Sequence, residues 1–347
     1  MKTIAVWSDT HLGKRMYRTD EDNVNKFEQI GYRIADEYSD MMIAENPDLI
    51  IHCGDFFDKH DPSILAITKY RAIQKKFQQA NIPTMSILGN HDFNIPNRKN
   101  NCSAPEMCMN TYFADYDLRV EVIDNILFVM MPYIYDTDEN IQEYMRRVEK
   151  IVEDSTENYD CKILITHGVT EKYSKESFIS DPILLSDYLV SLFDFVLIGH
   201  IHTPFEYKQG NTWVISPGGM IDYQANVDRT GFVLLDPNKK TFKRRQVITP
   251  HIIKEECTEE NINSVLESVT ENIYHIHYTG NSDAIDNDLF ISAQNTAINV
   301  VIDIAREEVE EVDEEKSTVC LDIYAYVNSK FPEHNPSFET AKEALVR

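Results

Sequence analysis

Five short polar motifs constrain this chain more than any other feature, because each follows an apolar run typical of a buried strand. In open α/β sheets, ligands bind outside the carboxyl ends of parallel strands, so we expect the motifs to converge at one edge. The expected strands are Ile4–Trp7, Leu49–His52, Thr84–Leu88, Ile163–Thr166 and Phe195–Ile198. The motifs that follow them are Asp9-Thr-His11, Gly54-Asp55, Gly89-Asn90-His91-Asp92, His167-Gly168 and Gly199-His200-Ile-His202.

Helical patterns lie between these strands and indicate βαβ units. Apolar side chains recur at helical spacing over residues 22–45, and Pro47 ends that helix before the next strand. The sequence therefore predicts an α/β fold in which a two-sheet β-sandwich is flanked by helices. The further helices are expected over 62–80, 139–153 and 181–193, two strands over 118–134, and a strand-rich segment over 212–247 that completes the second sheet.

The composition changes after Pro250, where we expect a smaller α+β region. The pattern predicts a helix and a strand within 259–280, and then a helix over much of Ile285–Glu311, which ends in an acidic run typical of a solvated face or linker. The tail resembles two short helices. The expected divisions are a main domain over 1–250, an α+β region over 251–312 and a helical tail over 318–347.

The charge balance argues against a broad nucleic-acid footprint. The net charge of the 347-residue chain is −25, and residues 251–347 hold 21 of its 58 acidic side chains but only 6 of its 33 basic ones. A protein that binds DNA mainly through its surface charge is usually basic. Bound cations would offset part of this charge. DNA held locally by metal ions and a few basic loops therefore stays compatible with the sequence.

Composition also predicts a cytoplasmic protein without a membrane segment. The first apolar run is too short for a secretory signal, and no stretch approaches the ~20 apolar residues of a membrane span. The six cysteines form no Cys-x-x-Cys pair, and Cys53 and Cys161 lie in or beside strand-like runs, which favours buried thiols. We expect a reducing setting, which is the host cytoplasm if a phage encodes the chain.

The motif residues are the nitrogen and oxygen ligands that a pair of divalent cations requires. Alternation along an extended chain places Asp9 and His11 on the same side, so one cation can take both. Asp55 is the natural bridging carboxylate. Two cations ~3.5–4 Å apart would activate a water and stabilise charge on a phosphoryl group. The remaining expected ligands are His202 on the first cation, and Asn90, His167 and His200 on the second.

We expect His91 to act on the substrate instead of binding metal. It neighbours the ligand Asn90, and two nearby cations disfavour further positive charge. An imidazole there can contact the phosphate or protonate the leaving oxygen. A carboxylate from Asp58 or Asp92 is expected to orient the ring.

Each motif alone is a weak signal, but together and in this order they resemble the calcineurin-like metallophosphoesterases. Within that superfamily the chain is most similar to SbcD-type DNA repair nucleases, including phage recombination endonuclease subunits. The likeness covers about residues 1–247 and is weak beyond them. The residues that carry the narrower likeness are His11-Leu-Gly13, Phe56-Phe-Asp58 with Pro62-Ser63, Gly199-His-Ile-His-Thr-Pro204, Ser216-Pro-Gly218 and Gly231-Phe-Val233.

The resemblance implies a function in DNA repair, recombination and replication. It implies a homodimer that cleaves DNA phosphodiesters exonucleolytically and endonucleolytically with two Mn²⁺ ions, or Mg²⁺ in their place, and with His91 as the transition-state histidine. It also implies an SbcC-type coiled-coil ATPase partner. On this basis residues 251–312 are a capping domain, and residues 318–347 are helices that dock on the ATPase, although they could equally pack on their own domain.

Two alternatives use the same motifs. The first is a phosphodiesterase or phosphatase that acts on small phosphoesters or phosphoproteins, and the second is a non-catalytic DNA-end-binding or scaffold protein. The complete ligand set argues against the second. Basic residues that flank the motifs are candidate DNA contacts, with solvated loop charges as the competing interpretation: Lys14, Arg15, Arg18, Arg98 and Lys99.

Overall fold

Two six-stranded sheets pack face to face in the computed structural model, which describes residues 1–16, 25–92, 104–105, 111–134, 138–155, 157–177, 183–221 and 230–305. This arrangement confirms the expected two-sheet sandwich. The first sheet runs β14 (Thr241–Gln246), β13 (Gly231–Asp236), β1 (Ile4–Trp7), β2 (Leu49–His52), β3 (Thr84–Ile87) and β4 (Tyr112–Ala114). The second runs β11 (Phe205–Gln209), β12 (Thr212–Ser216), β10 (Phe195–Ile198), β7 (Cys161–Thr166), β6 (Ile126–Met131) and β5 (Arg119–Ile123).

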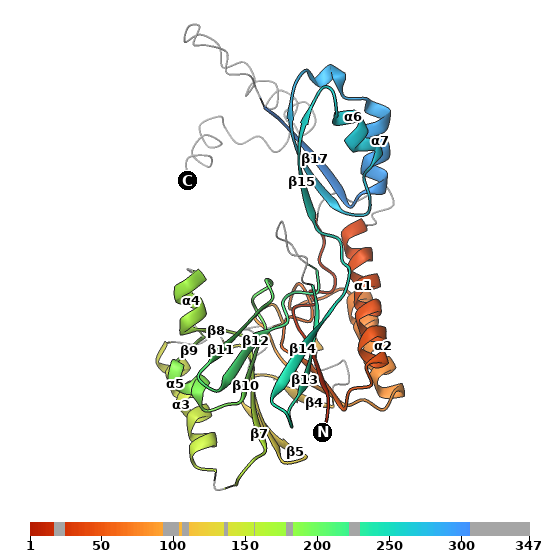
Figure 1. The fold of residues 1–347 in the computed structure, drawn as a ribbon. Coiled ribbons are helices and arrows are strands. Elements are labelled where there is room, and N and C mark those ends of the chain that lie inside the picture. The colour runs from red at the N-terminus through yellow and green to blue at the C-terminus, as the bar shows by residue number, and fades with distance from the viewer. Residues whose placement is uncertain are drawn as a thin grey trace, which may run out of the picture. The chain divides into compact units, whose positions relative to one another are not determined.

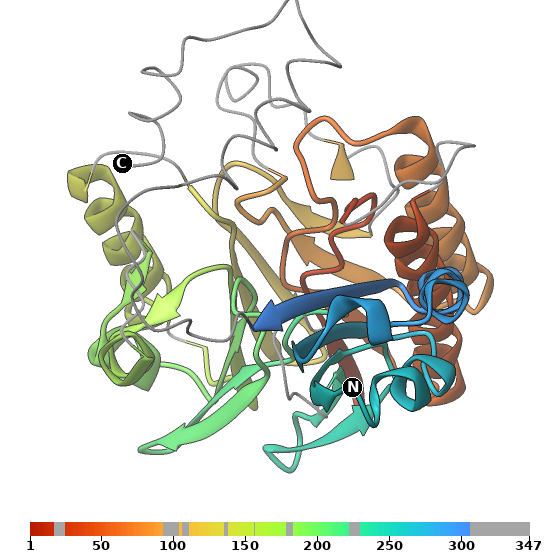
Figure 2. The same cartoon turned by 90° about the horizontal axis from the view of Figure 1, so that it is seen from above.

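Helices cover the outer face of each sheet, as Figure 1 and Figure 2 show. Helices α1 (Lys26–Ala44) and α2 (Ile64–Gln79) pack against the first sheet, while α3 (Asp138–Glu153) and α5 (Asp187–Ser191) pack against the second. A third apolar cluster fills the space between the sheets. The strands are therefore buried on both faces, which explains their almost uninterrupted apolar runs.

The helix boundaries follow from side-chain caps. Asn25 accepts the N–H of Glu28 at the start of α1, and Ser63 accepts the N–H of Ala66 at the start of α2, each at 3.1 Å. The three predicted helices over 22–45, 62–80 and 139–153 are confirmed. The helix predicted over 181–193 is shorter, because β9 (Leu184–Leu185) precedes α5. The sequence did not predict β4, β8 (Val169–Thr170), α4 (Glu171–Ser177) or β11.

The expectation that residues 212–247 complete the second sheet is only partly correct. β12 joins that sheet, but β13 and β14 extend the first, where β13 pairs antiparallel with β1 and Val233 lies opposite Val6. Phe232 packs with the cluster under α1, and Val233 faces the other sheet. A strand with two apolar faces needs an interior position, and the place beside β1 provides one.

The predicted helix over 285–311 is wrong beyond residue 296. Helix α7 (Asn287–Thr296) ends there, and Asn299–Ala305 forms strand β17. The β-branched run Val300-Val301-Ile302 fits a pleated sheet better than a helix. Strand β17 completes a parallel sheet with β15 (Ile252–Thr258) and β16 (Ile273–Thr279), which α7 and α6 (Ile262–Glu267) cover; a 3₁₀ turn spans Ser282–Ala284. The tail over 318–347 lies outside the described residues.

Two predictions from composition can be compared with the structure. Cys53 and Cys161 are free, buried thiols, as the strand-like runs predicted. In the part of the chain that the structure describes, no helix is both long enough and apolar enough to cross a membrane.

Helix α1 holds the 252–305 region through two cations. Lys26 Nζ donates to the carbonyl oxygens of Asn295, Thr296 and Ala297 at the end of α7, each at 2.7 Å. Arg33, two turns further along α1, pairs with Glu271. A cation that satisfies the last carbonyls of a helix also opposes the negative end of its dipole.

We expect Lys26→Met to loosen this contact. The loss of an ammonium at a helix C-terminus should cost about 0.3–1 kcal/mol locally. Amide hydrogen exchange should therefore become faster in α7 and in the following turn. Lys75→Met, at an exposed position of the neighbouring helix α2, is the control. Unchanged exchange in α7 of Lys26→Met would contradict the account.

Candidate metal centre

The predicted motif residues lie together at one edge of the sandwich. β1, β2 and β3 are parallel neighbours in the first sheet, and β7 and β10 are parallel neighbours in the second. Their carboxyl ends bring polar side chains from both sheets to a common edge. All seven predicted ligands belong to one network of short contacts: Asp9 and His11 after β1, Asp55 after β2, Asn90 after β3, His167 after β7, and His200 and His202 after β10.

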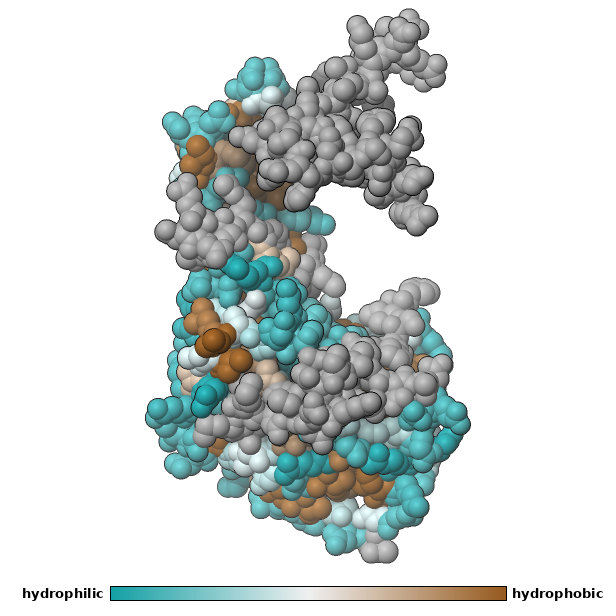
Figure 3. All heavy atoms as spheres, turned by 180° about the vertical axis from the view of Figure 1, so that it is seen from behind, coloured by the Kyte–Doolittle hydropathy of each residue, from teal (hydrophilic) through white to brown (hydrophobic). Residues whose placement is uncertain are grey.

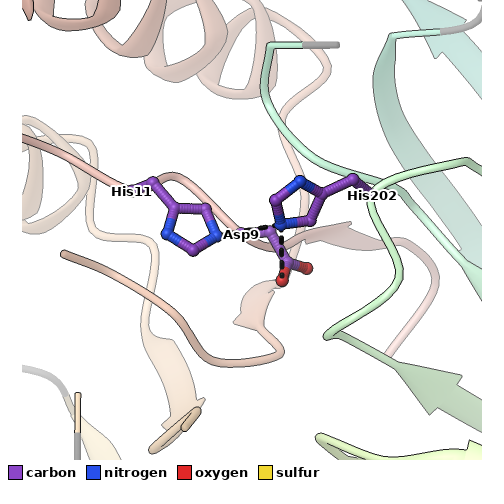
Figure 4. Close-up of side chains that lie close together, drawn as sticks. All are labelled: Asp9, His11 and His202. Atoms are coloured by element: carbon purple, nitrogen blue, oxygen red, sulfur yellow. Dashed lines mark hydrogen bonds and ion pairs between the residues drawn. The ribbon is translucent and has the colours of Figure 1, made fainter. Parts of the chain in front are cut away.

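The first group consists of Asp9, His11 and His202 (Figure 4). The Nε2 atoms of His11 and His202 face each other at 3.0 Å, and His202 Nε2 lies 3.9 Å from Asp9 Oδ1. The side chains of Asp9 and His11 are fully buried, whereas that of His202 is 25% exposed. Their ligand atoms all lie within 4.8 Å of one another, so they could hold one cation.

The second group consists of Asn90, His167 and His200. Asn90 Oδ1 lies 2.9 Å from His167 Nε2 and 3.0 Å from His200 Nδ1. His167 Nδ1 lies 2.7 Å from the carbonyl oxygen of Cys53, which can only accept a proton. This contact places the Nδ1 proton and leaves Nε2 directed into the group.

Asp55 lies between the two groups. Its Oδ2 is 3.3 Å from His167 Nε2 and 3.6 Å from His11 Nε2. Its Oδ1 accepts the backbone N–H of His91 at 2.8 Å. One oxygen of a buried carboxylate thus faces both sets of imidazoles, which is the position that a carboxylate shared by two cations requires.

The donor set fits two divalent cations. Adjacent ligands on a cation with bonds of about 2.1 Å lie ~3 Å apart, and His11, His202 and the atoms around Asn90 show separations of 2.9–3.0 Å. Asp9 and Asp55 are buried carboxylates, and buried charge needs compensation. Imidazole, carboxylate and amide donors without thiolates suit hard or borderline cations. This cluster is therefore a candidate dimetal site.

The charges within the site shift its pKa values strongly. Burial raises the pKa of Asp9 and lowers that of His11. Burial alone would lower the pKa of His167, but the negative charge of Asp55 raises it to about 10. Burial would likewise raise the pKa of Asp55, yet the charge of His167 holds it below its ordinary value. A proton on His167 thus compensates Asp55 in the metal-free site, and a cation would replace that proton.

Four candidate ligands have a left-handed backbone, a feature that no sequence pattern predicted. The φ angles are 51° at Asp9, 41° at His11, 56° at Asp55 and 79° at His200. Residues other than glycine rarely adopt this region, and each instance costs free energy. Such conformations persist where the surroundings determine the backbone, and they cluster at functional sites.

Two motif glycines provide the space that the cluster needs. A Cβ at Gly54, whose φ is +98°, would lie 2.6 Å from His167 Nδ1. A Cβ at Gly89 would lie 2.2 Å from Asp55 Oδ1 and 2.3 Å from its backbone nitrogen. Close packing against the ligands therefore requires glycine before Asp55 and before Asn90.

His91 lies beside the first group, with its ring centre 4.7 Å from that of His11. Its Nδ1 donates to the carbonyl oxygen of Asp58 at 2.7 Å, which leaves Nε2 as the other reactive nitrogen. Asp58 thus contacts His91, but through its backbone and not through the predicted carboxylate. That carboxylate instead accepts from Lys14 Nζ at 3.0 Å.

Asp92 has a different role from the one the sequence suggested. Its buried carboxylate accepts the backbone N–H groups of Phe56 and Gly89 at 3.0 Å and that of Phe57 at 3.2 Å. It therefore joins the loop after β2 to the loop after β3, instead of orienting His91. Burial and the nearby charge of Asp55 raise the pKa of Asp92 to about 8.

The predicted DNA contacts are described only in part. Lys14 pairs with Asp58, and Arg15 Nε lies 3.2 Å from a carboxylate oxygen of Glu28. Arg18, Arg98 and Lys99 lie outside the described residues. The two described cations thus have acidic neighbours and are not simply solvated.

Backbone groups complete the site, and side-chain patterns could not reveal most of them. The carbonyls of Cys53 and Asp58 orient two histidines. The N–H groups of Gly219 and Met220 donate to the carbonyls of His202 and Asp9, at 2.9 and 3.2 Å. The only sequence signal for this last contact was the Ser216-Pro-Gly segment that precedes it.

Comparison with known proteins adds relatives to this geometry. A model of the calcineurin-like phosphoesterase family matches residues 2–204. The DNA double-strand break repair protein Mre11 of Methanococcus maripaludis is 28% identical over 242 residues, which are 66% of this chain and 61% of that protein. A subunit of the nuclease SbcCD from Staphylococcus epidermidis is 26% identical over 313 residues, 78% of this chain and 79% of that protein. The match thus spans less than two thirds of the archaeal protein's length.

One solved structure similar to this chain is that of the protein TT1561 from Thermus thermophilus. It superposes with a TM-score of 0.47 at 13% identity, and the superposition covers 71% of this chain and 99% of that one.

We expect Gly89→Ala to disrupt the metal centre, because the new methyl group would displace Asp55. Mn²⁺ at about 100 times its dissociation constant should stabilise the wild-type protein by ~2.7 kcal/mol, and this gain should largely disappear in the variant. Thermal unfolding with and without Mn²⁺ measures it. Gly210→Ala is the control, since that glycine also has a positive φ but nothing lies within 4 Å of the added Cβ. An equal Mn²⁺ response in both variants would refute the packing argument.

Proposed function

The chain belongs to the calcineurin-like phosphoesterase family of hydrolases, and we propose that it is a two-metal DNA nuclease subunit. The observation that carries the proposal is the position of Asp55, whose Oδ2 faces His167 at 3.3 Å and His11 at 3.6 Å. Two relatives with nuclease or DNA repair names support DNA as the substrate.

We assign the ligands by the two groups of contacts, with Asp55 shared between them. Mn²⁺ suits a mixture of imidazole and carboxylate donors, with Mg²⁺ as the alternative. Bound there, the cations would activate a water and stabilise the charge that develops on the phosphoryl group. The first cation takes Asp9, His11 and His202, and the second takes Asn90, His167 and His200.

His91 and Asp58 complete the proposed mechanism. In phosphodiester hydrolysis, water attacks phosphorus, the P–O bond to the leaving oxygen breaks, and that oxygen gains a proton. Because the Asp58 carbonyl holds the Nδ1 proton of His91, Nε2 is the atom that can donate to the leaving oxygen. Asp58 is thus a positioning residue, and the neighbouring His11 ring restricts the His91 ring.

One observation favours the alternative substrate class of small phosphoesters or phosphoproteins. The described basic residues near the site, Lys14 and Arg15, already contact Asp58 and Glu28. With a net charge of −25, the chain also lacks the general attraction that most DNA-binding proteins have. The metal centre serves both classes equally, so only a substrate comparison separates them.

The proposal extends to partners and to the remaining domains. By resemblance, we assign residues 251–312 to a capping domain, residues 318–347 to binding of an SbcC-type coiled-coil ATPase, and the whole chain to a homodimer. The described surface in Figure 3 is largely hydrophilic, with apolar residues gathered in separate patches. Exposed apolar side chains such as Ile64 and Val122 are available to such partners.

His91→Ala should reduce Mn²⁺-dependent cleavage of linear double-stranded DNA by ~10²–10⁴-fold, because a general acid is lost. Bound Mn²⁺, measured by metal analysis, should stay at the wild-type level. His60→Ala, at an exposed position, is the control and should cleave normally. If the wild-type protein cleaves a small aryl phosphodiester but no DNA, even with its ATPase partner, the nuclease proposal fails in favour of the alternative.

Deletion of residues 318–347 tests the proposed partner. The tail carries apolar residues at Leu321, Ile323 and Val327 that suit a helix pair seeking a partner. The truncated protein should no longer co-purify with the ATPase, while Mn²⁺-dependent cleavage of an aryl phosphodiester should persist. Undiminished co-purification would sink this part of the proposal.

A further inference from the structure

Arg244 occupies an unusual position on β14, the edge strand of the first sheet. It lies opposite Val233 in the strand register, and Val233 belongs to the apolar cluster between the sheets. Phe242, two residues earlier on the same face, packs against that cluster. The Arg244 side chain is only 19% exposed. A charge thus stands at an inward position where the strand pattern calls for an apolar residue.

The guanidinium of Arg244 reaches across to the second sheet. Its Nε donates to Glu206 Oε2 at 2.7 Å, and its Nη2 donates to the carbonyls of Phe205 at 2.9 Å and Ser216 at 2.7 Å. Its Nη1 lies 3.3 Å from the carbonyl of Pro217. One side chain therefore joins β11 and the end of β12 to β14. Only the planar fork of arginine can serve so many acceptors at once.

The segment that Arg244 holds leads directly to the metal centre. After Ser216 and Pro217, the N–H of Gly219 donates to the carbonyl of His202 at 2.9 Å, and that of Met220 donates to the carbonyl of Asp9 at 3.2 Å. The chain turns sharply between these contacts, at Gly218 with φ +85°. A Cβ at Gly218 would lie 2.8 Å from the His202 carbonyl oxygen. Little slack thus remains between the arginine and the two ligand loops.

We propose that Arg244 is a positioning residue for one cation, because it sets the placement of His202 relative to Asp9. The inference rests on the proposed function, which assigns both residues to the first cation. The second cation site has its own anchor, the bond from His167 Nδ1 to the Cys53 carbonyl. Loss of Arg244 should therefore weaken the first site and leave the second nearly intact.

A purely structural role for Arg244 makes a different prediction. Inward-pointing charges are one way in which proteins protect edge strands from pairing with other chains. In that case the loss of Arg244 would lower the stability or the solubility and leave the affinities of both cations unchanged. The difference between the two cation sites is thus the deciding measurement.

Calorimetric titration of the full chain with Mn²⁺ tests the proposal. The wild-type protein should bind two ions, and Arg244→Met should bind one of them about 10- to 100-fold more weakly, as expected when a group that supports a ligand is lost. Arg244→Lys keeps the charge without the fork, so it should weaken the same site; it also decides the outcome if Arg244→Met does not fold. Arg245→Met, the next residue on β14, pairs with Glu45 and should titrate as the wild type.

The outcomes separate the two proposals. If the wild type binds two ions and Arg244→Lys binds both with unchanged affinities, the positioning inference is overturned and the proposed function stands. Equal weakening of both sites would also overturn it, because the inference requires a selective effect. If the wild type binds no Mn²⁺, the proposed function fails, and this inference fails with it.

Discussion

The rest of the structure depends on one buried carboxylate, that of Asp55, held between imidazoles that come from both sheets. Its oxygens contact His11 and His167 and accept the backbone N–H of His91. That arrangement requires Gly89 to approach without a side chain and Asp55 itself to adopt a left-handed backbone. The sandwich supplies the means, because two parallel sets of strands end at the same edge.

Burial of so much charge is costly, and the protein reduces the cost in several ways. Asp55 and His167 oppose each other, three backbone N–H groups surround Asp92, and the Cys53 carbonyl anchors His167. Two divalent cations would neutralise the remaining carboxylates. Metal binding and the stability of this edge are therefore linked, because a ligand that binds only the folded state stabilises that state.

The sequence predicted the strands that support the site better than it predicted the rest of the fold. Motif residues such as Asp9 and His167 follow short apolar runs, so strand and site could be recognised together. Strand β17 was missed because Val300–Ile304 adjoins a helical pattern, and β13 was placed in the wrong sheet because its register with β1 depends on distant residues. The carbonyls of Asp58 and Cys53 act through the backbone, and Arg244 acts through the carbonyl oxygens of Ser216 and Pro217, none of which a side-chain pattern displays.

The central claim is that this cluster holds two cations that share Asp55. Anomalous diffraction at the manganese edge, from crystals grown with Mn²⁺, tests it most directly. The account predicts two peaks separated by ~3.5–4 Å, one within reach of His11 and His202 and the other within reach of Asn90 and His200, with Asp55 between them. A single peak, or peaks that do not include Asp55 among their ligands, would contradict it.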